Sequence, residues 1–268
     1  MACAARSVLL VAALALTVSP LEGQRRSRSF PRRPPPENVN FEEFNVPYDG
    51  RFAFVRLRFT PTAIGWGGGG GFFGGVNYQW DHDYPRAERH FTRILSEVTT
   101  LSPLTNASNI LALDDPELFK YPVAYMSEPG YWTLTEAEVE GFRDYLHKGG
   151  FVIFDDFVGG HWFNFEEQMR RVLPNHRLVR LDASHPIFHS FFEIESLDQY
   201  IHPYRFVPSV FYGVFEDNDP NKRLMVIANY NNDIGESWEW SDTGWIPIDL
   251  TNEAYKLGIN YIVYAMTH

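Results

Sequence analysis

A short apolar run at residues 151–154, Phe-Val-Ile-Phe, restricts the fold of this chain more than any other feature. Four consecutive apolar residues are typical of a strand that is buried on both faces inside a parallel sheet. An amphipathic helix is predicted just before this run, with Val139, Phe142 and Leu146 on one face and Gly149 at its end. A helix that leads directly into a doubly buried strand predicts a βαβ unit.

The same alternation of strands and helices continues along the chain. Strands are predicted at 52–59, 123–126, 177–181, 212–215 and 224–228, and helices at 85–98, 164–173 and near the C-terminus. Thr133 with Glu136 is the expected capping box of the helix before residue 149, and Thr251 is the expected N-cap of the last helix. The sequence therefore predicts an α/β domain, a three-layer arrangement in which a mostly parallel sheet has helices on both faces.

The N-terminus predicts export. Residues 8–18 are apolar and follow Arg6, and this run is shorter than the roughly 20 residues that cross a bilayer. We interpret residues 1–23 as a signal peptide that is cleaved between Thr17 and Gln24, with an uncleaved anchor as the alternative. No later segment is expected to span a membrane. Residues 24–45, rich in arginine and proline at their start, are expected to be a disordered linker, and 46–268 the folded domain.

Charge and cysteine content exclude several classes of function. The net charge is −11 although residues 24–36 carry five arginines and no acid, so the rest of the chain is strongly acidic. An acidic surface argues against a nucleic-acid partner. The only cysteine, Cys3, lies within the predicted signal peptide, so we expect no disulfide and no catalytic thiol in the mature protein.

Side chains that directly follow the predicted strands are the candidates for a site, because ligands bind at the carboxyl ends of strands in open α/β sheets. Asp155 and Asp156 follow the buried strand, and His161 comes shortly after them. These three could hold a divalent metal or act as acid and base. In the alternative interpretation, one aspartate accepts hydrogen bonds from loop N–H groups and the other faces water.

Further candidates come from neighbouring segments. Glu128 and Asp233 follow other predicted strands and could bind a ligand, and Asp83 could join a metal site. A helix cap is the preferred interpretation of the 81–83 segment that contains Asp83. Trp66, within the glycine-rich residues 65–75, could stack on a ligand or simply fix the loop. His185 could reach the site, but a structural role is favoured.

Three tryptophans near the C-terminus, Trp238, Trp240 and Trp245, form a cluster in the sequence. They could hold a sugar or a partner, or cover one end of the sheet. Nucleotide-binding glycine motifs, a nucleophile elbow and a zinc-binding H-E-x-x-H pattern are all missing. No organic cofactor is therefore expected, and a divalent metal is the cofactor that remains possible.

Several segments together resemble a bacterial family, domain of unknown function 4159. The resemblance rests on Leu118, Phe119, Tyr121 and Pro122, on 134–135, 142–146, 149–151 and 155–156, on 185–188, on Arg223, 226–227, Asp233 and 238–239, and on 256–260. It implies a fold similar to class I glutamine amidotransferases, which is flavodoxin-like, and a place in the periplasm or cell envelope. It implies no activity, and without a cysteine after residue 3 the amidotransferase reaction is excluded.

These observations lead to two main hypotheses, beside a purely scaffolding role within an envelope complex as a third possibility. The first is a non-catalytic, exported domain that binds an envelope protein, a glycan or a peptide in its strand-end cleft. The alternative is a metal-assisted hydrolase that uses Asp155, Asp156 and His161, with Asp83 as a further metal ligand. Whether the protein is an enzyme depends on which of these side chains come together.

Overall fold

The computed structural model describes residues 40–62 and 78–268. The predicted signal peptide, most of the predicted linker and the glycine-rich segment with Trp66 lie outside these residues. The 3₁₀ helix η1 (Phe41–Phe44) lies before residue 46, the predicted start of the folded domain. Asn45 also lies before this boundary, and its side chain exchanges hydrogen bonds with the backbone of Ile110. In the described residues, no helix is both long enough and apolar enough to cross a membrane.

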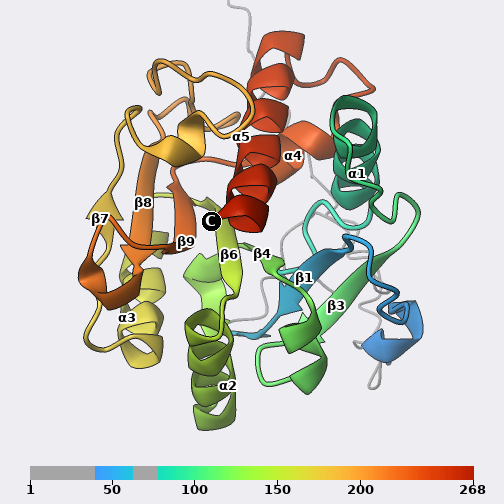
Figure 1. Cartoon of the computed structure of the whole chain (residues 1–268). Helices are drawn as coiled ribbons and strands as arrows, with labels where there is room; N and C mark the ends of the chain where they lie inside the picture. Colours follow the sequence, from blue (N-terminus) through green and yellow to red (C-terminus); the bar gives the residue numbers. More distant parts are fainter. Residues whose placement is uncertain (1–39, 63–77) are drawn as a thin grey trace, which may run out of the picture. The chain divides into compact units, whose positions relative to one another are not determined.

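The described residues form a seven-stranded sheet in the order β3-β1-β4-β6-β9-β8-β7 (Figure 1). The parallel strands are β1 (Phe54–Arg58), β3 (Ser108–Ala112), β4 (Val123–Ser127), β6 (Phe151–Phe157) and β9 (Leu224–Tyr230). At one edge, β8 (Val210–Phe215) pairs antiparallel with β9, and β7 (Val179–Arg180) pairs antiparallel with β8. The short strands β2 (Thr60–Pro61) and β5 (Trp132–Thr133) pair separately. The predicted α/β class and mostly parallel sheet are confirmed.

The order of the strands reverses at β1. The chain passes from β1 to β3 on one side and then returns to β4 on the other side. Because the connections leave β1 in opposite directions, the carboxyl ends of β1 and β4 are the place where open α/β sheets bind their ligands. β3, which the sequence analysis did not predict, is the strand that creates this reversal.

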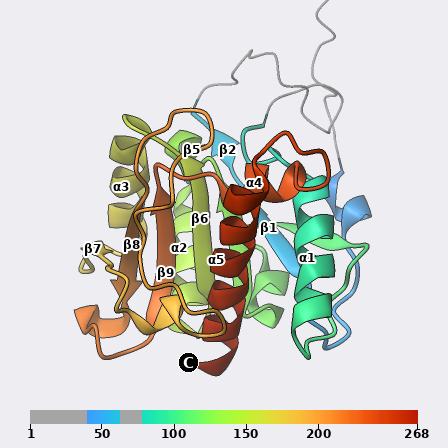
Figure 2. The same ribbon diagram turned by 90° about the horizontal axis from the view of Figure 1, so that it is seen from above.

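Five α-helices are present in the described residues: α1 (Arg86–Val98), α2 (Glu136–His147), α3 (His161–Val172), α4 (Ile234–Glu239) and α5 (Ile248–Thr267). Short 3₁₀ helices connect the elements: η2 (Pro116–Lys120), η3 (Pro129–Tyr131), η4 (Pro186–Phe188) and η5 (Glu216–Asn218). In Figure 2, α4 lies next to one end of α5 and close to α1. The first turn of α4 lies near the carboxyl ends of β6 and β9, and this proximity brings α4 to the acidic ends of the strands.

Two predicted helix caps were wrong, and α3 begins at His161 rather than at the predicted residue 164. The capping box of α2 is formed by Thr135 and Glu138, whereas Thr133 belongs to β5. Both threonines are followed by a glutamate at the right spacing, so the sequence alone does not distinguish them. The last helix begins at Ile248, directly after Pro247, so Thr251 lies inside it rather than at its cap.

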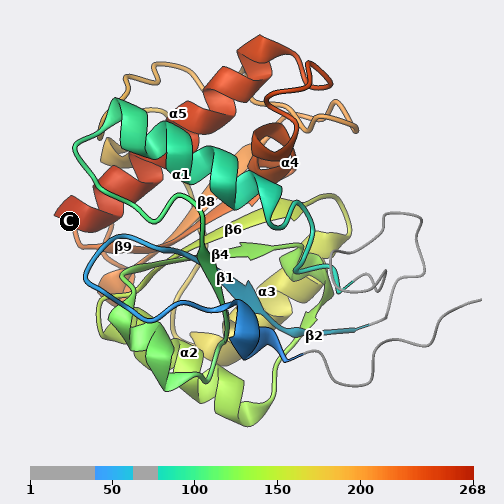
Figure 3. The same cartoon turned by 90° about the vertical axis from the view of Figure 1, so that its right-hand side faces the viewer.

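The buried side chains form two hydrophobic clusters. Phe54, Tyr125 and Ile153 of the sheet join a cluster that includes residues of α1, α4 and α5. The residues that come after Phe54 and Ile153 in sequence, Val55 and Phe154, join a second cluster with residues of α2 and α3. Successive residues of a strand point to opposite faces, which explains why neighbours divide between the clusters. Figure 3 shows α1 and α5 on the other side of the strands from α2 and α3.

Candidate functional site

Acidic side chains converge at the carboxyl ends of the central strands. Glu128 directly follows β4, Asp155 and Asp156 lie in the last part of β6, and Asp233 is the N-cap of α4 after β9. His82 lies in the segment before α1 and reaches the same region. The structure thus brings together several residues that the sequence analysis placed after separate strands.

Asp155 is fully buried, and both oxygens of its carboxylate accept hydrogen bonds from other residues of the protein. One oxygen, Oδ2, accepts the Tyr125 hydroxyl at 2.9 Å and the backbone N–H groups of Ile234 at 2.9 Å and Gly235 at 3.0 Å. The other, Oδ1, accepts the side-chain amide of Asn229 at 3.0 Å. Asp155 therefore fixes the first turn of α4 against β4 and β9, where a carboxylate also interacts favourably with the helix dipole.

Asp156 has a different environment from its neighbour. It adopts φ 55° where the pairing of β6 with β9 shifts between Phe154 and Phe157, and it is only partly buried. Its Oδ2 atom lies 3.6 Å from Nδ1 of His82, and the same nitrogen lies 3.3 Å from Oε1 of Glu128. The shift in pairing allows consecutive aspartates to serve different purposes, one in the interior and one in the site.

Three groups of side chains in the described residues could hold a metal ion, each with its ligand atoms within 4.8 Å of one another. They are His82 with Glu128 and Asp156, Asp156 with His202 and Asp233, and Asp83 with Glu236 and Glu239. Of the predicted metal ligands, Asp156 and Asp83 belong to these groups, and Asp155 and His161 do not. The sequence analysis singled out neither His202 nor Glu236 and Glu239, because no spacing connects them with the strand ends.

Burial, together with the charges of neighbouring carboxylates, raises the pKa values of several acidic groups in the site. Burial and the nearby charge of Asp156 raise the pKa of Glu128 to about 8. Burial and the charges of Asp233 and Asp156 raise the pKa of Asp83 well above its usual value, and burial raises that of Asp233 in the same way. Protonation relieves the repulsion between such carboxylates, and a bound cation would do the same.

His82 carries the compensating positive charge. Burial of its ring opposes protonation, but the hydrogen bond to Asp156 and the charge of Glu128 outweigh this effect and raise the pKa to about 9. Arg56 of β1 holds this segment in place by donating to the carbonyl oxygens of Trp80 at 2.9 Å and His82 at 2.8 Å. The position of His82 therefore depends on a buried arginine in the adjacent strand.

The other predicted candidates have local roles in the structure. His161 begins α3, packs against the ring of Tyr131 at 4.6 Å, and has its pKa lowered by burial. His185 accepts the backbone N–H of Ile187 as the N-cap of η4, as the structural interpretation expected. Among the described residues no side-chain hydrogen bond caps α1, and Asp83 accepts the N–H groups of Arg86 and Ala87 with its backbone carbonyl oxygen, so the helix-cap interpretation was wrong for the carboxylate of Asp83.

The C-terminal tryptophans separate into two environments. Trp238 is fully buried and stacks on Phe91. Trp240 and Trp245 instead line an open cleft of about 520 Å³ with Tyr204, Glu236, Thr243 and Gly244. We call this the aromatic cleft. We call the three groups of carboxylate and histidine side chains described above the acidic site. Glu236 belongs both to the aromatic cleft and to the acidic group with Asp83, so the cleft adjoins the acidic site.

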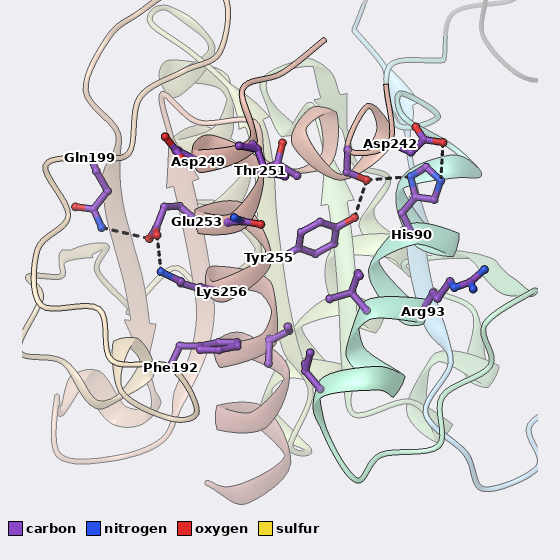
Figure 4. Close-up of a pocket in the computed structure, with 16 residues that line it drawn as sticks. His90, Arg93, Phe192, Gln199, Asp242, Asp249, Thr251, Glu253, Tyr255 and Lys256 are labelled. Atoms are coloured by element: carbon purple, nitrogen blue, oxygen red, sulfur yellow. Dashed lines mark hydrogen bonds and ion pairs between the residues drawn. The ribbon is translucent and has the colours of Figure 1, made fainter. Parts of the chain in front are cut away.

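A larger depression of about 1100 Å³ lies between α1 and α5, away from the strand ends (Figure 4). Several of its polar side chains are paired with one another: Gln199 and Lys256 with Glu253, Tyr255 with Ser241, and His90 with Ser241 and Asp242. These paired groups do not require a ligand, and among the described residues the depression brings together no cluster of carboxylates like that at the strand ends. The acidic site is therefore the stronger candidate for function.

Residues 72–266 match the family model described as domain of unknown function (DUF4159). The chain belongs to this family. The match covers the acidic site and the aromatic cleft, so both are parts of the DUF4159 domain. No curated protein matches the sequence.

Proposed function

We propose that this DUF4159 protein is exported to the periplasm or cell envelope and binds a positively charged ligand without catalysis at its acidic strand-end site. Export rests on the apolar segment 8–18 after Arg6. The binding role rests on one observation: carboxylates from separate strands converge around Asp156, and burial together with the charge of Asp156 raises the pKa values of Glu128 and Asp233.

The same observation favours a positively charged ligand. A cation placed among Glu128, Asp156 and Asp233 relieves repulsion that the free protein relieves by binding protons. An anionic ligand would increase this repulsion, which is consistent with the expectation that nucleic acid is not a partner. A basic peptide of an envelope protein or an amine-bearing glycan has the required charge.

The architecture that we propose for the domain is the three-layer, flavodoxin-like arrangement of class I glutamine amidotransferases. Support comes from the strand order around β1 and from the two hydrophobic clusters, one with α1, α4 and α5 and the other with α2 and α3. A shared architecture licenses no shared reaction. Asp155 lies where β6 ends, and its buried, fully hydrogen-bonded carboxylate supports a structural role for this position.

The test compares binding with turnover in the same samples. Purified protein is titrated with a lysine-rich peptide by calorimetry and incubated with peptidoglycan fragments, peptides and glycans while the products are monitored by mass spectrometry. We expect salt-sensitive binding, weakened at least tenfold by Asp156→Asn, and no products. The control is Asp144→Asn, an exposed change in α2 that leaves the site intact. Hydrolysis of any substrate that Asp156→Asn abolishes would overturn the proposal.

A metal-assisted hydrolase is the second candidate, and one observation favours it. His82, Glu128 and Asp156 present one nitrogen and two carboxylate ligand atoms within 4.8 Å of one another, a set suited to Zn²⁺ or Mn²⁺. In this case Asp156 and Glu128 would hold the ion, and Asp155 would support them through the backbone without touching it.

Metal analysis separates the two candidates. The second candidate requires a stoichiometric metal in the purified protein, or a rise in melting temperature with Zn²⁺ or Mn²⁺ that His82→Asn removes. His147→Asn, at the exposed end of α2, is the matched control. Protein that holds no metal, and whose melting temperature does not change with either ion, would eliminate the hydrolase.

A further inference from the structure

We infer that the aromatic cleft binds an alkylammonium group, as in a lysine side chain, with the ammonium directed at Glu236 and the alkyl part against Trp245. The inference rests on the proposed function, because the cleft and the acidic site share Glu236. It goes further by naming the chemical class of the ligand and by placing its recognition on residues outside the strand ends.

The aromatic cleft exposes rings that a soluble surface seldom leaves uncovered together. Trp245 is 69 % exposed and Tyr204 is 46 % exposed, and the cleft between them holds about 520 Å³. This volume accommodates a small organic group and lies within the range of ligand pockets. Large exposed aromatic side chains around a hollow are typical of binding sites.

Hydrogen bonds hold the walls of the cleft in place. The indole N–H of Trp245 donates to the Tyr204 hydroxyl at 3.2 Å, and that hydroxyl donates to Oε1 of Glu236. Thr243 ties the loop together by donating to the carbonyl oxygen of Trp240 at 2.8 Å and accepting the backbone N–H of Trp245 at 3.1 Å. The polar edges of these rings are therefore occupied, and the ring faces are what the cleft offers to a ligand.

One residue that lines the cleft, Glu236, belongs to a group of three carboxylates. Glu236 has its carboxylate within 4.8 Å of ligand atoms of Asp83 and Glu239. Asp83 is only 9 % exposed and its side chain is hydrogen-bonded to that of Glu236, whereas its Oδ2 atom, next to Gly235 at the first turn of α4, has no geometric hydrogen-bond partner in the described part of the chain. A buried carboxylate oxygen without a partner is costly, and a bound cation would supply the missing charge.

A cation is favoured over a neutral sugar for two reasons. First, stacking a sugar on Trp245 leaves the repulsion among Asp83, Glu236 and Glu239 unchanged. Second, the guanidinium carbon of Arg86 already lies 4.9 Å from the centre of the Trp240 ring, so a ring of this cleft does interact with a positive charge. Aromatic faces together with carboxylates form the type of cage that recognises ammonium groups.

A metal ion alone would not account for the cleft. An ion held by Asp83, Glu236 and Glu239 would use only carboxylate oxygens and would leave the faces of Tyr204 and Trp245 without a function. An alkylammonium group uses both features, because its methylene groups pack on the rings and its charge faces the carboxylates.

The test is an NMR titration of the full-length protein with matched small probes. Nα-acetyl-lysine methylamide carries the ammonium group, and Nα-acetyl-norleucine methylamide has a similar alkyl chain without the charge. We expect the lysine probe to shift the indole resonance of Trp245 in a saturable manner. The norleucine probe is expected to bind at least tenfold more weakly. Glucosamine tests whether an amine from a glycan source is bound as well as one from a peptide source.

Variants locate the binding. Trp245→Ala and Glu236→Gln are each expected to weaken binding of the lysine probe about tenfold. Phe206→Ala, which removes an aromatic side chain 73 % exposed and outside the cleft, is the matched control and should change nothing. Because Trp245 is mostly exposed, its replacement leaves the hydrophobic core intact.

Two outcomes would overturn the inference. Equal binding of the lysine and norleucine probes would show that the charge is not recognised, and unchanged binding by Trp245→Ala would show that the cleft is not used. If Asp156→Asn abolishes binding of the lysine-rich peptide but Trp245→Ala does not affect it, the proposed function stands and the role of the cleft fails. If the protein binds neither the probes nor the lysine-rich peptide, both the proposed function and the role of the cleft are contradicted.

Discussion

Arg56 of β1 and Glu88 of α1 form an ion pair whose two side chains are almost completely buried. The same arginine donates to the carbonyl oxygens of Trp80 and His82, and its guanidinium lies 5.1 Å from the ring of Tyr125. One buried side chain therefore connects the central sheet, the first helix and the segment that carries His82 into the site. Stability and site geometry are coupled through it.

We predict that Arg56→Met destabilises the protein by about 3–5 kcal/mol, because Glu88 then remains buried without its partner. The measurement is the free energy of unfolding from urea denaturation monitored by circular dichroism. The double variant Arg56→Met/Glu88→Leu should recover most of this loss, since it leaves no unpaired charge. Lys148→Met, which breaks an exposed pair with Asp144, should change the free energy by less than ~1 kcal/mol. A double variant no more stable than Arg56→Met would contradict the explanation.

The raised pKa values of the site predict an unusual dependence of stability on pH. Between pH 4.5 and about 8 the folded protein retains a proton on Glu128 that the unfolded chain has released. Between pH 6.5 and about 9 it likewise retains the proton on His82. The folded state binds more protons than the unfolded chain in both ranges. The contribution of these two groups to the free energy of unfolding therefore decreases as pH rises.

We therefore expect the free energy of unfolding to fall from pH 4.5 towards pH 9, measured by urea denaturation at several pH values. Other groups also titrate, so the informative comparison is with Glu128→Gln, in which the decrease should be smaller. Glu140→Gln, an exposed change within α2, should keep the slope of the wild type. A slope that Glu128→Gln leaves unchanged would show that this carboxyl does not carry the effect.

Asp155 and Asp156 should respond oppositely to the same substitution. Asp155→Asn replaces an oxygen of a carboxylate that accepts four hydrogen bonds, so we predict a loss of about 2–4 kcal/mol of stability. Asp156→Asn removes one of the mutually repelling charges and should leave stability equal or higher. Thermal and urea unfolding of both variants measure the difference. Equal destabilisation by the two changes would be inconsistent with separate structural and site roles.

The central strands and their acidic ends could be predicted from the sequence because the information is local. Residues 151–154 are apolar on both faces, and Gly149, with φ 112°, ends α2 as the pattern indicates. The residues directly after each strand are equally visible in the sequence, so Glu128, Asp156 and Asp233 were found. The family resemblance also rests on short motifs in fixed order and is confirmed.

The partners of these residues could not be predicted, because they come from distant parts of the chain. His202 and Glu236 reach the site through loops and a short helix whose positions depend on tertiary packing. The sequence analysis offered distinct roles for Asp155 and Asp156 as its alternative interpretation, but which of the two is buried depends on a shift in strand pairing that the apolar pattern of β6 does not encode. Trp238 and Trp245 look alike in sequence, yet one is in the core and the other at the surface.

Substitution of Gly258 and of Gly160 by alanine should have opposite effects on stability, because close packing requires a glycine only at residue 258. A Cβ atom on Gly258 of α5 would lie 2.5 Å from the Trp238 ring and 2.6 Å from the Phe91 ring, which stack on each other at 4.4 Å. Gly258→Ala should therefore force apart α1, α4 and α5 and cost about 1–3 kcal/mol.

Gly160, the N-cap of α3, has φ −64° and no atom within 4 Å of an added Cβ. Gly160→Ala should therefore stabilise the protein by about 0.4–1 kcal/mol, because alanine adopts this backbone conformation without strain and restricts the unfolded chain. Differential scanning calorimetry of both variants measures the opposite shifts in melting temperature. If Gly258→Ala melts at or above the temperature of the wild type, the packing of α5 against the Trp238–Phe91 stack is looser than these contacts require.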